Sequence, residues 1–103
     1  MDKETALKLA RDYVRSLVSC RYYKVKEAFL FGSYAKNRFT DDSDIDIAIV
    51  LEGYRDTIKE LSNLMRIRRG FDLRIEPHPV TQKYFEDDNP FNREIKKGLK
   101  ILW

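Results

Sequence analysis

The stretch FGSYAKNRFTDDSDIDIAIV, residues 31–50, decides how this chain folds. A Gly-Ser pair stands ten residues ahead of an Asp-Ile-Asp triplet, Asp44 to Asp46, and this triplet opens an apolar run that ends at Leu51. A β-branched run of this kind, closed by Glu and Gly, predicts a buried strand. Ionised carboxylates rarely enter a protein core without a partner, so we expect some group to neutralise the two aspartates.

The composition is that of one globular domain over residues 1–103. Hydrophobic residues make up 43% of the chain and charged residues 36%, and no apolar run approaches the roughly 20 residues of a membrane span. The start, MDKETALKL, lacks the basic and apolar segments of a signal peptide, so we expect a cytoplasmic protein. The net charge is +3, but the basic runs 66–69 and 93–97 are typical of solvated helix faces. Direct nucleic-acid binding is therefore left open and is not favoured.

The hydrophobic pattern predicts the α+β class, with a small mixed sheet of about three strands packed against helices. The third strand is expected over 71–76, where apolar and polar residues alternate until Pro77 interrupts them. The expected elements are a helix over 3–19, a strand over 25–31, one helical turn over 34–37 after a Ser33 cap, a strand over 44–51, a helix from 54 to Gly70, the strand over 71–76, and two short helices that begin near Thr81 and at Asn89-Pro90.

The two aspartates are the first candidate functional residues. Side chains alternate across a strand, so Asp44 and Asp46 are expected to point the same way and to repel each other. A divalent cation keeps both ionised and relieves the repulsion. All-oxygen ligation favours Mg²⁺ or Mn²⁺ over zinc. The competing interpretation is purely structural: the Gly-Ser pair forms the corner of a hairpin, and the aspartates are acidic residues at the start of a strand. The Gly-Ser pair alone, or the aspartates alone, would favour this interpretation.

The Gly-Ser pair supplies the phosphate side of the predicted site. Gly32 lets a polyphosphate approach the backbone, and Ser33 adds a hydroxyl where free N–H groups can hold an anion. Asp72, on the polar face of the predicted third strand, is the expected third carboxylate, and Glu76 on the same face is the reserve candidate. Two metals held by three carboxylates suit an in-line displacement at phosphorus. His78, between two prolines, is interpreted as extended backbone at a strand exit, with a role near a ligand as the less favoured alternative.

These residues resemble a known family. Gly32-Ser33, ten residues and Asp44-Ile45-Asp46 resemble the GS(x10)DxD signature of the polymerase β-like nucleotidyltransferase superfamily. The short length, the leading helix and the segments FDLRIEP and NPFNREIKKG resemble the minimal nucleotidyltransferases over nearly the whole chain. The resemblance implies a single minimal nucleotidyltransferase domain with a two-layer nucleotidyltransferase fold. One departure is Asn37, where the family often has Gly; Asn tolerates left-handed backbone, so we expect the turn to be kept.

The resemblance also implies roles for the candidate residues. Asp44 and Asp46 would coordinate two Mg²⁺ ions, and Asp72 would hold the catalytic metal and help to deprotonate the acceptor hydroxyl. Gly32 and Ser33 would grip the triphosphate of ATP. Lys36 would contact a phosphate.

Many minimal nucleotidyltransferases are the antitoxin half of HEPN/MNT toxin-antitoxin pairs. The implied reaction is therefore transfer of AMP from ATP to a tyrosine hydroxyl of a HEPN-domain ribonuclease toxin, within a hetero-oligomer. Two alternatives remain open at this point. The chain could neutralise its toxin by contact alone, or it could transfer nucleotides to RNA or to a small molecule, although it has no extra domain that would track a strand.

Overall fold

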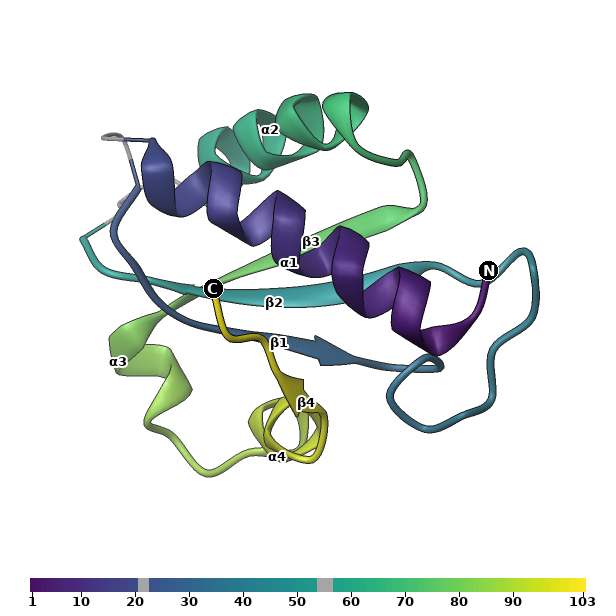
Figure 1. Cartoon of the computed structure of the whole chain (residues 1–103). Helices are drawn as coiled ribbons and strands as arrows, with labels where there is room; N and C mark the ends of the chain where they lie inside the picture. Colours follow the sequence, from purple (N-terminus) through teal and green to yellow (C-terminus); the bar gives the residue numbers. More distant parts are fainter. Residues whose placement is uncertain (21–22, 54–56) are drawn as a thin grey trace.

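The computed structural model describes residues 1–20, 23–53 and 57–103, and Figure 1 shows their arrangement. The fold is a four-stranded mixed sheet with helices on both faces. The predicted α+β class and mixed sheet are confirmed, with one strand more than expected. The elements are α1 (Lys3–Ser19), β1 (Val25–Phe31), β2 (Ile45–Leu51), α2 (Thr57–Ile67), the 3-10 turn η1 (Arg68–Gly70), β3 (Ile75–Thr81), α3 (Gln82–Phe85), α4 (Pro90–Lys96) and β4 (Leu99–Lys100).

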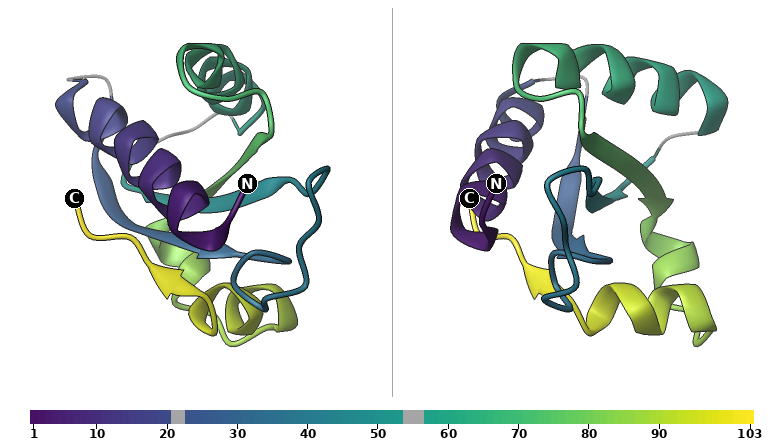
Figure 2. Two further views of the ribbon diagram at one scale, coloured as in Figure 1. Left: turned by 45° about the vertical axis from the view of Figure 1, so that its right-hand side comes forward. Right: turned by 90° about the vertical axis from the view of Figure 1, so that its right-hand side faces the viewer.

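The sheet has the strand order β3-β2-β1-β4. The central pair β1 and β2 is antiparallel, β3 runs parallel to β2, and β4 pairs antiparallel with β1. The long helices α1 and α2 cover one face of this sheet, and the short helices α3 and α4 lie against the other (Figures 1 and 2). The parallel pairing brings the starts of β2 and β3 to the same end of the sheet, where the chain also leaves β1.

The main core lies between the sheet and α1. This helix starts at an Asp2 cap, whose carboxylate accepts a hydrogen bond from the Thr5 N–H at 2.7 Å. Its fully buried side chains recur at three-and-four spacing and pack on the alternate residues of β2 that face them. The Tyr13 hydroxyl donates to the Leu64 carbonyl of α2 at 2.8 Å, which ties the two helices together. The buried residues of α1 are Ala6, Ala10, Tyr13, Val14 and Leu17.

A second, smaller apolar cluster lies on the other face of the sheet. It joins β1, β2 and β3 to α3 and α4, whose caps are Thr81 and Asn89 as predicted. Asp46 precedes the cluster residue Ala48 by two positions and so shares its face. This face therefore changes from apolar to acidic toward the start of β2. The cluster consists of Phe29, Phe31, Ala48, Val50, Val80, Phe85 and Ile95.

The position of the third strand corrects the prediction. We expected it over 71–76, but β3 spans Ile75–Thr81 and runs through both Pro77 and Pro79. Residues 71–74 form a turn, in which the Phe71 and Asp72 N–H groups donate to the Arg68 carbonyl at 2.9 and 3.0 Å. Proline is accepted in β3 because this is an edge strand, and alternate residues direct their N–H groups to the same side.

The helical turn expected over 34–37 is present as a single turn. Lys36 N–H donates to the Gly32 carbonyl at 3.1 Å, which is the i to i−4 bond of an α-helix, and the turns over 32–37 do not continue into a helix. Asn37 has a φ of 58°, so this residue does adopt the left-handed backbone that we expected it to tolerate. The second predicted helix is present as α2, which continues into η1 up to Gly70, and within α2 Leu64 is fully buried whereas Ile58 is 80% exposed. The predicted start of this helix, Tyr54, lies outside the described residues.

Within residues 1–20, 23–53 and 57–103, no helix has both the length and the apolar character needed to cross a bilayer.

Candidate active site

Gly32 and Asp46 form the centre of the candidate site. Gly32 directly follows β1 and has a φ of +75°, which disfavours any residue with a side chain. If a Cβ were added there, it would overlap Oδ2 of Asp46, and it would also lie 3.2 Å from the carboxyl carbon. The backbone at residue 32 therefore approaches this carboxylate as closely as only glycine allows. The two halves of the sequence motif, separated by a long loop, meet here.

The pairing of the sheet explains this meeting and adds a third residue. Asp46 lies on the central strand β2, opposite Phe31 of β1 and opposite Glu76 of β3. Residues that pair across neighbouring strands carry their side chains on the same face, and the strands are about 4.8 Å apart. Asp46 and Glu76 therefore share one face of the sheet at the end where the loop after Gly32 begins. This places the reserve candidate Glu76, and not Asp72, beside Asp46.

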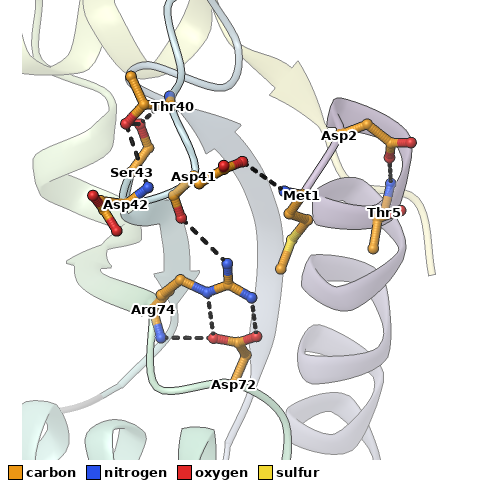
Figure 3. Close-up of polar contacts among 9 residues, drawn as sticks. All are labelled: Met1, Asp2, Thr5, Thr40, Asp41, Asp42, Ser43, Asp72 and Arg74. Carbon is orange, nitrogen blue, oxygen red and sulfur yellow. Dashed lines mark hydrogen bonds and ion pairs between the residues drawn. The ribbon is translucent and has the colours of Figure 1, made fainter.

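Asp72 lies in the turn before β3 and is bound to Arg74. Its carboxylate accepts hydrogen bonds from the Arg74 backbone N–H at 2.9 Å, from Nε at 3.0 Å and from Nη2 at 2.7 Å (Figure 3). The side-chain hydrogen bonds from Arg74 hold the pKa of Asp72 at about 2, although partial burial opposes this shift. The sequence-based placement of Asp72 on the polar face of a strand is thus wrong, because the strand begins three residues later.

The loop that leads into β2 is closely hydrogen-bonded. The Thr40 N–H donates to the Ser43 hydroxyl at 2.8 Å (Figure 3). The Ser43 N–H donates to the Thr40 carbonyl at 3.1 Å. Arg74 anchors the end of this loop, since its carbonyl accepts from the Ile45 N–H at 2.8 Å. Asp44, between Ser43 and Ile45, is exposed to solvent. The turn around Asp72 and the loop thus form one support for the start of β2.

Ser33 and Lys36 lie in the turn after β1. Ser33 is half-buried next to Gly32, and its carbonyl accepts from the Arg38 N–H at 2.9 Å. Lys36 forms an ion pair with Glu94 of α4, in which the two side chains are 48% and 33% exposed. The turn therefore connects the end of β1 with α4, the helix on the face of the sheet that carries Asp46.

The sequence favoured a structural role for His78 over a role in this site. Its Nε2 lies 3.1 Å from Oδ1 of Asp46. Pro77 was expected to end the third strand, so the alternation of side chains between the two faces of the sheet was not continued from Glu76 to His78. Counting two residues on from Glu76 through the prolines would have placed His78 on the same face.

Comparisons with known proteins identify the family of this chain. The sequence model of the family described as Nucleotidyltransferase domain matches residues 7–102. This chain belongs to that family. The nucleotidyltransferase is 32% identical over 95 residues to MJ0604 of Methanocaldococcus jannaschii, a protein provisionally named a protein adenylyltransferase; the alignment covers 92% of this chain and 84% of that relative. The predicted family and the prediction of an enzyme are both confirmed.

Two solved structures share the fold of this nucleotidyltransferase. One is a Sulfolobus solfataricus protein provisionally described as a nucleotidyltransferase, with a TM-score of 0.70, 21% identity, and coverage of 95% of this chain and 80% of that one. The other is a mutant of the toxin-antitoxin pair MntA-HpeT, with a TM-score of 0.56, 19% identity, and coverage of 99% and 73%. At these identities the likeness establishes the fold.

Nucleotidyltransferases act on a nucleoside triphosphate with a divalent metal, and the residues present suit both groups. Asp44, Asp46 and Glu76 supply the carboxylate oxygens that Mg²⁺ prefers. The side-chain-free backbone at Gly32 provides the close approach that a polyphosphate needs. Among the described residues, no three His, Cys, Asp or Glu side chains lie close enough to enclose an ion. Metal binding beside Asp46 would therefore require Asp44 or Glu76 to change rotamer while the strands keep their register.

Proposed function

We propose that this nucleotidyltransferase transfers AMP from ATP to a tyrosine hydroxyl of a HEPN-domain ribonuclease toxin and acts as its antitoxin in a hetero-oligomer. The observation that carries the proposal is the contact between the Gly32 backbone and the Asp46 carboxylate, because it joins a phosphate-binding turn to a metal-binding carboxylate. The names of the related proteins support the acceptor class. MJ0604 is named for adenylyl transfer to protein, and MntA-HpeT is a toxin-antitoxin pair.

In the proposed reaction, the tyrosine oxygen forms a bond to the α-phosphorus of ATP while the bond from that phosphorus to the bridging β-phosphate oxygen breaks. Pyrophosphate leaves, and the hydroxyl proton passes to a carboxylate. Two bound Mg²⁺ ions would supply charge stabilisation at the attacking and leaving oxygens. Asp44 and Asp46 would hold the ions, and Gly32 and Ser33 would orient the triphosphate.

We assign the third carboxylate to Glu76 in place of Asp72. Glu76 pairs with Asp46 across β2 and β3, whereas the Asp72 carboxylate is engaged by three hydrogen bonds from Arg74. Using Asp72 as a metal ligand or base would mean breaking those bonds and separating it from a cation. Glu76 is half-buried on the face that also carries Asp46, so its side chain needs only a rotamer change.

The test is intact-mass spectrometry of a HEPN toxin encoded beside this protein, incubated with the nucleotidyltransferase, ATP and Mg²⁺. We expect the toxin to gain the mass of AMP on a tyrosine and to lose its ribonuclease activity. Asp46→Asn should abolish the gain, whereas Asp42→Asn, which changes an exposed aspartate of the preceding loop, should not. Protection from the toxin by Asp46→Asn without any added mass would instead establish neutralisation by contact. Labelling of RNA with no labelling of protein would establish a nucleic-acid acceptor.

A further inference from the structure

His78 contacts the carboxylate oxygen of Asp46 that does not lie against Gly32. Oδ2 of Asp46 lies against the Gly32 backbone, while Oδ1 lies 3.1 Å from Nε2 of His78. The two side chains are 31% and 25% exposed, so the contact is only partly open to water. An Asp carboxylate rotates readily about its last torsion unless both oxygens are engaged. Here each oxygen has a different neighbour.

The packing around His78 fixes where its imidazole lies. Phe31 meets the ring edge-on, with centroids 5.0 Å apart and planes at 64°. Phe91 of α4 lies 6.2 Å from the imidazole and 6.0 Å from Phe31, so the three rings form one group. The residue that pairs with His78 on β2 is Ala48, whose small side chain leaves room for the imidazole to reach Asp46. The ring is thus held by neighbours that make no hydrogen bond to it.

We propose that His78 is a positioning residue, which donates a hydrogen bond from Nε2–H to Oδ1 of Asp46 and so holds this carboxylate in its rotamer against Gly32. The inference rests on the proposed function and deepens it. An ionised carboxylate only accepts hydrogen bonds, so Nε2 is the donor in this pair. The benefit to the reaction is a carboxylate that is already oriented before metal and nucleotide arrive.

The proposal differs from a purely packing role for the imidazole. If His78 only filled space beside Phe31 and Phe91, an apolar side chain of similar size would serve equally well. If it orients Asp46, the position of the N–H matters. Partners that hydrogen-bond to metal-binding carboxylates typically affect metal affinity or activity by about 10 to 100-fold when removed.

The test compares three substitutions with the wild-type enzyme at one fixed pH. His78→Leu removes the hydrogen-bond donor. His78→Asn keeps an amide donor, but its shorter side chain holds the amide nearer the backbone than Nε2 was. His78→Gln places an amide close to the former position of Nε2. Phe91→Leu is the matched control, because it alters the packing on the imidazole and keeps the donor. The readouts are Mn²⁺ affinity, measured by electron paramagnetic resonance with an ATP analogue that cannot be cleaved between the α- and β-phosphates, together with kcat and KM for AMP transfer.

We expect His78→Leu and His78→Asn to weaken Mn²⁺ binding by about 10 to 100-fold and to lower kcat more than they raise KM. His78→Gln should recover most of the affinity, and Phe91→Leu should bind Mn²⁺ almost as the wild type does. Equal Mn²⁺ affinity in His78→Leu and wild type would overturn the proposal, as would a His78→Gln no better than His78→Asn. If the wild type itself binds no Mn²⁺, the proposed function fails and the role of His78 fails with it.

A second measurement needs no folded variant. His78 is the one histidine of the chain, so its ¹⁵N imidazole signals are assigned without mutagenesis. In the metal-free wild type we expect Nε2 to carry a proton, as a donor to Asp46 must. A ring that exchanges between both tautomers, or that carries its proton on Nδ1 alone, would contradict the proposal.

Discussion

The carboxylate of Asp46 occupies the space that a side chain on residue 32 would need. The glycine of the first half of the motif is therefore required by the aspartate of the second half, in addition to its φ of +75°. The spacing in the sequence reflects this contact, because a loop connects the end of β1 to the start of β2 and returns the chain to the same end of the sheet.

Gly32→Ala should abolish most activity through this overlap. Gly53→Ala is the matched control, since Gly53 has a φ of +82° and no described atom within 4 Å of its added Cβ. We expect both variants to lose about 1 to 2 kcal/mol of unfolding free energy in urea from backbone strain. Only Gly32→Ala should also lose about 100-fold in AMP transfer, because the displaced carboxylate no longer orients the nucleotide. Equal losses of activity in the two variants would show that backbone strain alone is responsible.

Glu76→Gln and Asp72→Asn should separate the two candidate third carboxylates. We expect Glu76→Gln to lower kcat by at least about 100-fold with little change in melting temperature, because a metal-binding or proton-accepting group is lost. Asp72→Asn should lower the melting temperature and leave kcat within about tenfold of wild type, because it weakens the support of the loop. Steady-state kinetics beside thermal unfolding decides between them. The reverse order of effects would restore the role of Asp72.

The Asp72–Arg74 pair should give the protein a defined loss of stability in acid. The pKa of Asp72 falls from 3.8 to about 2 on folding, chiefly through the hydrogen bonds from Arg74. The unfolded state thus binds the proton more tightly, and the pair stabilises the fold above pH 3.8 by about 1 to 2 kcal/mol, an amount that is lost as the pH falls toward 2. Urea unfolding from pH 6 to 2 should show a shallower fall in Asp72→Asn than in wild type. Parallel curves would contradict this assignment.

Lys36 should help to hold ATP at the cost of its ion pair with Glu94. Both side chains are substantially exposed, so the pair adds little stability and a triphosphate can displace the carboxylate. We expect Lys36→Met to raise the KM for ATP severalfold, and Glu94→Gln to lower it, with melting temperatures almost unchanged. Lys26→Met is the matched control, because Lys26 forms a similarly exposed pair with Glu52 away from the site. A KM that is the same in all variants would exclude a contact between Lys36 and phosphate.

Local patterns were sufficient to predict much of this fold. The helix over 3–19 and the strand over 25–31 have the predicted bounds, because each has an apolar periodicity and an end signal within its own residues. The second strand differs by one residue at its start. The proximity of Gly32 to Asp46 was likewise predictable, since it depends on a single connection between neighbouring strands.

The third strand was not predictable in the same way. Its two prolines argue against a strand unless the strand lies at the edge of a sheet, and the edge position depends on pairing between distant parts of the chain. Hydrogen bonds from Phe71 and Asp72 to Arg68 hold the residues before β3 in a turn, although their apolar-polar alternation resembles a strand. Because β3 begins at Ile75, Asp72 lies in the turn before the strand, whereas Glu76 and His78 lie in the strand on the same face as Asp46.

The prolines of β3 have a last consequence for how another protein can approach. Pro77 and Pro79 leave the outer margin of β3 without two of the amide hydrogens that an added strand would need, and the opposite margin ends in the two-residue β4. A visiting polypeptide therefore gains little from continuing the sheet on either side. Under the proposed function, the chain that presents a hydroxyl at Asp46 would be recognised mainly through side chains, because neither edge of the sheet offers a full row of backbone partners.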